Sequence, residues 1–222
     1  MVDDPTDSTA PPDANWSPAE EEIMKATYRA LLEHGYAGLS ISRIAEELDK
    51  SKASIYYHYD SKDALLVAFL EYAADQFESS VATETGDDPR ADLDHVVEKV
   101  LPRRPSEDQR QVQSVILGLR SQAVTNEAFS EQFTAMDDRL AATVRQIVDR
   151  GIEEGAFRDV DAAQVAEHVL ATVNGAMYAR ATTDREDAVA SVRDSLSAYL
   201  DATLATASST LEDGTSAPED ET

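Results

Sequence analysis

Residues 40–59 most constrain how this chain folds, because they form two short helix-like segments separated by a tight turn. Ser40 is suited to cap the first segment, since its hydroxyl can accept a hydrogen bond from a free backbone N–H. Asp49 and Lys50 form the turn, and Ser51 is predicted to cap the second segment. The first segment has apolar side chains at helical spacing, which predict one buried face: Ile41, Ile44, Ala45 and Leu48.

The second segment is unusual in the side chains that it is predicted to expose to solvent. Ile55 and Tyr59 lie one helical turn apart and are predicted to face inward. In a DNA major groove, small residues allow close approach, hydroxyls and lysine meet phosphates, and aromatic edges reach sugars or thymine methyl groups. The outward face has this composition and is a candidate DNA-reading surface: Lys52, Ala53, Ser54, Tyr57 and His58.

Residues 38–66 resemble the helix-turn-helix of the tetracycline-repressor (TetR/AcrR) family of transcriptional regulators. The matches are dense and in register: Ile44-Ala45, Ser51-Lys52, Ile55-Tyr56-Tyr57-His58 and Ser61-Lys62-Asp63. The resemblance implies that the second helix enters the major groove, and that a lysine opening the fourth helix touches a phosphate. Carried over by position, the DNA contacts are Tyr56, Tyr57, His58, Lys52 and Lys62, with Ser40, Ser42 and Arg43 near phosphates at the start of the first helix.

The sequence departs from the family pattern in the turn. Asp49 stands where the family usually has glycine, and Asp tolerates the left-handed conformation at some cost. Lys50 stands where a buried valine is usual, so we expect its stem to pack while its ammonium emerges toward DNA or solvent. The full predicted DNA-binding set is Ser40, Ser42, Arg43, Lys50, Ser51, Lys52, Ala53, Ser54, Tyr56, Tyr57, His58 and Lys62.

The charge balance is unusual for a protein expected to touch a polyanion. The 222 residues include 19 basic and 44 acidic side chains, a formal net charge of −25. Between residues 40 and 62 the numbers of basic and acidic side chains are equal, so the excess of acidic residues lies elsewhere in the chain. Two explanations are possible: acidic tails that repel non-specific partners, or adaptation of the whole surface to a salt-rich cytoplasm. Because acid is spread through every segment and lysines are few, we favour the second explanation, an acidic variant resembling those of salt-adapted archaea.

The remaining sequence predicts an all-α protein. Residues 1–15 and 206–222 are predicted to be disordered, the second as an acidic tail. Residues 17–77 form the DNA-binding domain, with its helix-turn-helix at about 40–59, and residues 90–205 form a helical regulatory and dimerisation domain. We found no secretion signal or stretch of membrane-spanning length, and there are no cysteines, so we expect a cytoplasmic protein that does not contact the membrane.

The segment from 126 to 183 resembles, more loosely, the regulatory domain of the same family. In the family the last two long helices pair with their copies in a second subunit, which implies a homodimer on a pseudo-palindromic operator in double-stranded DNA. Two apolar stripes supply candidate interface residues, although an intramolecular core is the alternative for about half of them: Val165, Val169, Val173 and Met177 on one helix, and Val189, Val192, Leu196, Tyr199 and Leu200 on the next.

The resemblance also implies a cavity for a small-molecule effector. Arg120 either faces solvent or meets an anionic ligand group, because its neighbours along the chain are apolar. For the other candidates, simple core filling is the alternative. The complete set is Phe69, Tyr72, Phe77, Leu117, Arg120, Phe129, Phe133, Met136, Leu140, Met177 and Tyr178.

The sequence contains none of the catalytic or phosphate-binding motifs tested, and the histidines are scattered, so we expect no enzymatic activity, cofactor or metal. Two functions remain. The favoured one is a dimeric transcriptional repressor released by a small-molecule effector. The alternative is a DNA-binding regulator without such an effector, controlled by a protein partner or by salt. An apolar cavity of a few hundred Å³ would favour the first, and a collapsed core the second.

Overall fold

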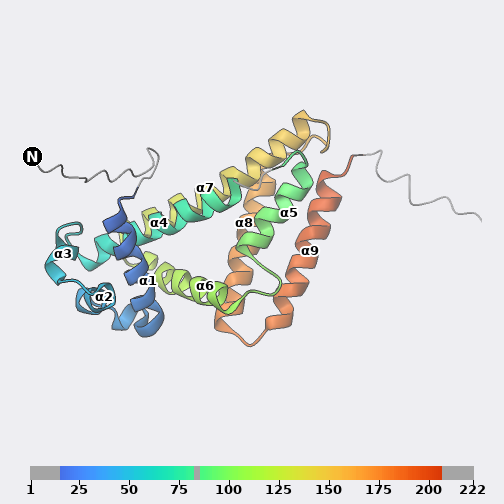
Figure 1. The fold of residues 1–222 in the computed structure, drawn as a ribbon. Helices are drawn as coiled ribbons and strands as arrows, with labels where there is room; N and C mark the ends of the chain where they lie inside the picture. Colours follow the sequence, from blue (N-terminus) through green and yellow to red (C-terminus); the bar gives the residue numbers. More distant parts are fainter. Residues whose placement is uncertain (1–15, 83–85, 207–222) are drawn as a thin grey trace, which may run out of the picture.

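The computed structural model describes residues 16–82 and 86–206 (Figure 1). The predicted disorder of residues 1–15, and of the tail beyond Thr206, lies outside the described residues. Within them every regular element is helical, which confirms the predicted all-α class. The elements are α1 (Pro18–Gly38), α2 (Ile41–Leu48), α3 (Lys52–Tyr56), α4 (Lys62–Ala82), α5 (Pro89–Val100), α6 (Glu107–Arg120), the 3₁₀ turn η1 (Ser121–Val124), α7 (Glu127–Glu153), α8 (Ala162–Thr182) and α9 (Glu186–Leu204).

Local sequence signals account for where these helices begin. Ser17 accepts a hydrogen bond from the backbone N–H of Glu20, whose carboxylate accepts one from the backbone N–H of Ser17 at 2.9 Å. This reciprocal capping box, followed by Pro18, starts α1. Asn126 and Asp161 cap α7 and α8 in the simpler way, each accepting a backbone hydrogen bond on its side chain.

The N-terminal helices gather at one end of the molecule, and α8 and α9 lie toward the other (Figure 1). The core beneath α1–α4 is completed from the regulatory segment by side chains of α6 and α7: Val115, Leu119, Phe129 and Phe133. The four helices α1–α4, called the reading unit below because they contain the predicted helix-turn-helix, are therefore not packed against one another alone. The reading unit shares a hydrophobic core with the segment predicted to sense an effector.

A second core joins α5, α7, α8 and α9. Six side chains predicted for the dimer interface are buried in this core within a single chain: Val165, Val169, Val173, Val189, Leu196 and Leu200. Val192 and Tyr199 are partly buried against it. The intramolecular alternative therefore accounts for these stripes, because α8 and α9 need their apolar faces to pack on α5, α7 and each other. The opposite faces of α8 and α9 remain exposed on the single chain.

No helix in the described ranges is both long enough and apolar enough to cross a membrane.

Candidate functional site

The turn between α2 and α3 sets the direction of α3, the helix predicted to enter the major groove and called the reading helix below. Asp49 is left-handed, with φ of 53° and ψ of 36°, as its replacement of glycine predicted. The backbone N–H of Lys50 reaches back to the carbonyl oxygen of Ala45 at 3.2 Å. Ile44 and Ile55 are fully buried on either side of the turn. The buried pair anchors α2 and α3 on α1 and α4, so the outer side of α3 is held in a defined direction.

The outer side of α3 has the predicted composition. Tyr57 is 86% exposed and Tyr56 is 52% exposed, which is unusual for rings of this size. The Tyr57 ring packs edge-on against His58, with ring centroids 5.2 Å apart. Ser51, Lys52, Ala53 and His58 are exposed too, and Ser54 is half-buried. The predicted reading surface is thus open to a ligand as large as DNA.

Two details of the predicted set differ. Ser51 occupies the N-cap position but makes no side-chain cap, and the Ser54 hydroxyl instead donates to the Ser51 carbonyl oxygen at 2.5 Å. The Lys50 ammonium reaches the surface, but it pairs with Glu22 of α1 at 2.5 Å. This hydrogen bond lowers the pKa of the Glu22 carboxyl. Lys50 therefore ties the turn to α1, and a phosphate would have to compete with a carboxylate for it.

The other three cations predicted to meet phosphates, Arg43, Lys62 and Lys52, differ in the groups that they contact. Arg43 donates a hydrogen bond to the carbonyl oxygen of Gly38, beside the start of α2. The Ser40 side chain caps α2, and Ser42 in its first turn is half-buried. Lys62 lies over the ring of Tyr36, 4.3 Å from its centroid. In the part of the chain that the structure describes, Lys52 makes no ion pair. Lys52 is exposed, so no carboxylate in that part of the chain would compete with a phosphate for it.

The start of α4 is connected to the start of α7, a link that the sequence did not reveal. Asn126, the cap of α7, donates from its side-chain nitrogen to Asp63 of α4 at 3.1 Å. Beside it, Tyr36 under Lys62 packs edge-on against Phe129 of α7, with centroids 6.3 Å apart. These two contacts join the start of α7 to the residues before and after the predicted helix-turn-helix.

A cavity of about 340 Å³ lies among α4, α6, α7 and α8, with a largely apolar lining. Five predicted effector residues line it: Phe77, Arg120, Met136, Leu140 and Met177. Six do not. Phe69, Phe129 and Phe133 fill the N-terminal core, Leu117 is half-buried elsewhere on α6, Tyr72 lines a separate shallow groove and Tyr178 is 61% exposed. Helical spacing cannot distinguish a core face from a cavity face, because both are apolar.

The charged groups of the cavity are mostly paired. Arg120 pairs with Asp137 and lies over the Phe133 ring at 5.0 Å, so it neither projects freely into solvent nor awaits an anion. Arg139 pairs with Asp75 at 2.9 Å, and Glu78 lies 3.7 Å away. Asp108, in the first turn of α6, also lines the cavity, and no ion pair involves it within the described ranges. Sequence reasoning missed these acidic groups because isolated carboxylates usually mark a solvated face.

No cluster of three or more metal-ligating side chains occurs within residues 16–82 and 86–206.

Comparison with known proteins agrees with this arrangement. The family model "Bacterial regulatory proteins, tetR family" matches residues 23–69, and the model "BetI-type transcriptional repressor, C-terminal" matches residues 89–205. A helix-turn-helix transcriptional regulator of Mycobacterium tuberculosis is 31% identical over 164 residues, covering 72% of this chain and 75% of its own.

Two solved structures are similar over nearly their whole length. A TetR transcription regulator from Haloarcula marismortui has a TM-score of 0.78 and 39% identity, covering 86% of this chain and 100% of its own. A transcriptional regulator from Saccharomonospora viridis, solved in complex with choline, has a TM-score of 0.73 and 27% identity, covering 85% and 98%.

The chain belongs to the TetR family of transcriptional regulators. Regulators of this family bind DNA operators and form dimers, and the matched family and relative are named as regulators and not as enzymes.

Replacing Tyr57 with alanine tests the reading surface. Because Tyr57 is exposed, Tyr57→Ala should leave the helical circular dichroism unchanged and weaken operator binding by about 1 to 3 kcal/mol, the range for one good DNA contact. Fluorescence anisotropy with a labelled operator measures the loss. The control is Val124→Ala, which truncates a comparably exposed side chain outside α3 and should bind DNA normally. Unaltered binding by Tyr57→Ala would remove Tyr57 from the DNA interface.

Proposed function

We propose that this protein is a dimeric repressor that dissociates from its operator when a small molecule binds among α4, α6, α7 and α8. The observation that carries the proposal is the position of α4. Its first turn carries Lys62 and Asp63 next to the reading unit, and its later turns contribute Ala73 and Phe77 to the cavity wall. One rigid helix thus contacts both sites.

The route from ligand to DNA follows from these contacts. A ligand that displaces α4 against α7 would strain the link between Asp63 and Asn126 and the aromatic contact of Tyr36. The two reading helices of a dimer must match the spacing of successive major grooves, so a small displacement of α4 weakens binding. The open cavity supports this function over the alternative of a regulator without an effector. Acting on chromosomal DNA, the regulator would work in the cytoplasm.

A quaternary ammonium compound is the first effector class to test. The Saccharomonospora viridis neighbour was solved with choline. In this chain, the carboxylate of Asp108 lines the cavity, as does the ring of Phe77. A carboxylate and an aromatic face are the groups that attract such a cation. The apolar wall would accommodate its methyl groups.

The dimer contact is proposed on the outward faces of α8 and α9. Exposed residues recur on α8 at alternating steps of four and three, which is the spacing of a helix-packing seam. His168 on this face stacks on Tyr199 of α9, with centroids 3.9 Å apart, so the two faces are continuous. A Cβ at Gly175 would meet nothing within 4 Å in one chain, which leaves room for a second subunit. The proposed face comprises Gln164, His168, Ala171, Gly175, Tyr178, Ser195, Ala198, Tyr199 and Ala202.

We also propose that the acidity adapts the protein to a salt-rich cytoplasm. Carboxylates are exposed on helices of both domains, for example Glu33, Glu71, Glu131 and Glu167, so they do not belong to the tail alone. In molar salt such a surface keeps the protein solvated. Near DNA it repels phosphate and requires cation uptake.

Choline addition tests the effector proposal. It should weaken operator binding by about 5- to 150-fold, the usual range of coupling between two sites, measured by fluorescence anisotropy. Thr143→Trp fills part of the cavity and should abolish the response while retaining DNA binding. Ala142→Trp, one residue away and exposed, should respond as the native chain does. No response of the native protein to choline would reject this effector class, and a persistent response in Thr143→Trp would move the site elsewhere.

The interface proposal predicts the effect of charge on two exposed alanines. The double change Ala171→Asp and Ala198→Asp should leave the single-chain core intact and bring unpaired carboxylates into the subunit contact, where burial is costly. Light scattering should then report monomers, and operator affinity should fall. Ala142→Asp on α7 adds a similar exposed charge and should remain dimeric. If the double variant stayed dimeric, the contact would lie on another face.

The charge proposal predicts a weak dependence on salt. Arg43, Lys50, Lys52 and Lys62 supply four cations per subunit and eight per dimer, so counterion release alone sets a log–log slope no steeper than about −7. Cation uptake by the carboxylates should make the measured slope much shallower, so that it vanishes or reverses at molar potassium. Anisotropy titrations across a wide range of potassium chloride measure it. A steep, monotonic loss matching eight released ions would contradict the salt adaptation.

A further inference from the structure

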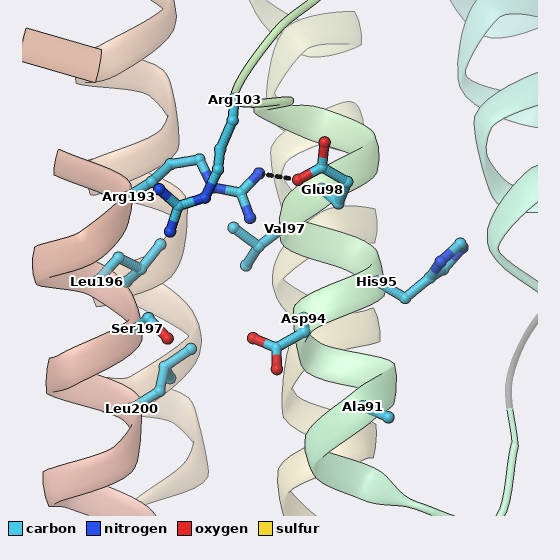
Figure 2. A pocket seen from close by; sticks show the side chains of 10 residues that line it. All are labelled: Ala91, Asp94, His95, Val97, Glu98, Arg103, Arg193, Leu196, Ser197 and Leu200. Carbon is cyan, nitrogen blue, oxygen red and sulfur yellow. Dashed lines mark hydrogen bonds and ion pairs between the residues drawn. The ribbon is translucent and has the colours of Figure 1, made fainter. Parts of the chain in front are cut away.

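A second cavity lies between α5 and α9, on residues different from those of the effector cavity. Its volume is about 490 Å³. Figure 2 shows two arginine side chains, Arg103 and Arg193, spanning the space between the helices at one end. Buried apolar side chains form its wall: Val97 from α5, and Leu196 and Leu200 from α9.

Arginine side chains bridge the two helices around this cavity. Arg90 of α5 donates to Asp201 at 3.0 Å and to the Ser197 hydroxyl at 3.1 Å, both on α9. From the other side, Arg193 of α9 donates to Glu98 of α5. These bridges hold α5 and α9 across the opening, so the cavity has a defined width.

Arg193 has unused hydrogen-bonding capacity. Only 10% of its side chain is exposed. Its contacts with the Glu98 carboxylate and with the Leu101 carbonyl oxygen, at 2.6 Å, both come from Nη1. Its Nε is buried and has no hydrogen-bond partner within the described ranges. A buried donor left unpaired is costly, and the Nε–Nη2 edge of a guanidinium is shaped to bind a carboxylate with two parallel hydrogen bonds.

The surrounding charges limit the ligand to one negative charge. Asp94 and Glu98 line the same cavity, and each is already paired with an arginine, Arg90 or Arg193. Arg103, the other cation of the cavity, is paired with Asp194. A second carboxylate on the ligand would therefore meet these acids without an unpaired cation to offset the repulsion. The apolar wall favours a hydrocarbon chain behind the carboxylate.

We propose that the cavity between α5 and α9 binds a short-chain monocarboxylate. The carboxylate lies on the Nε edge of Arg193, and the chain extends along Val97, Leu196 and Leu200 toward Ala91, which Figure 2 places at the end away from the arginines. The bound ligand bridges α5 and α9. The site shares no lining residue with the effector cavity, so the two ligands do not compete for one place.

Titration calorimetry of the full chain with acetate, butyrate and hexanoate, at constant potassium chloride, tests the proposal. Affinity should rise about tenfold from butyrate to hexanoate, because two further methylene groups are buried. Adipate, with a carboxylate at both ends, should bind more weakly than hexanoate. Equal affinity for all chain lengths would show an inorganic-type anion site only, and absence of hexanoate binding would show none. Either result overturns the proposal.

Variants locate the binding. Arg193→Lys keeps the charge but removes the forked edge, and should weaken hexanoate binding about tenfold or more. Ala91→Phe alters an exposed position and should obstruct the far end, so that hexanoate loses affinity while acetate does not. This variant decides the matter if Arg193→Lys fails to fold. Arg145→Lys on α7 is the control and should bind normally. Thr143→Trp should also bind hexanoate normally, and a loss there would place hexanoate in the effector cavity and overturn the proposal.

Discussion

Burial of Phe129 and Phe133 in the core of the reading unit is the interaction on which the rest of the structure depends. Both belong to α7, the long helix that also packs against α5 and α8 in the regulatory core. Each fully buried side chain of this kind contributes about 1.5 to 3 kcal/mol. α7 therefore contributes side chains to both hydrophobic cores and joins them. The same anchoring positions Asn126 against Asp63 and Tyr36 against Lys62.

Charge is used inside this protein mainly to connect helices. With 19 basic residues against 44 acidic ones, cations are scarce. Arg150 of α7 pairs with the buried Asp92 of α5, Arg139 of α7 pairs with Asp75 of α4, and Arg29 of α1 pairs with Glu47 of α2. The first two of these pairs are partly buried, and such pairs are screened less by salt than exposed ones such as Arg29–Glu47. These arginines thus serve internal bridges, whereas Lys52 makes no ion pair in the part of the chain that the structure describes.

Much of the architecture could be predicted from the sequence because its signals are local. The Ser17 capping box, the left-handed turn at Asp49 and the helical spacing around Ile44 depend only on neighbours a few residues away. The exposure of Tyr57 followed from the inward direction of Ile55 on a short helix. Other features could not be predicted. Pairing of Lys50 with Glu22, and the contact of Asp63 with Asn126, join residues far apart in sequence and carry no local signature.

The sequence by itself determined the helical class and the composition of the exposed side of α3, since each depends on the periodicity and capping of one segment. Only the tertiary structure decided which apolar face meets which neighbour. It placed Val169 and Leu196 in the core of one chain and left Tyr178 outside. It also separated Met136 and Met177, which line a cavity, from Phe69, which fills a core. An apolar side chain gains the same free energy by leaving water in any of these places, so its identity cannot specify the partner; the relative placement of the helices does.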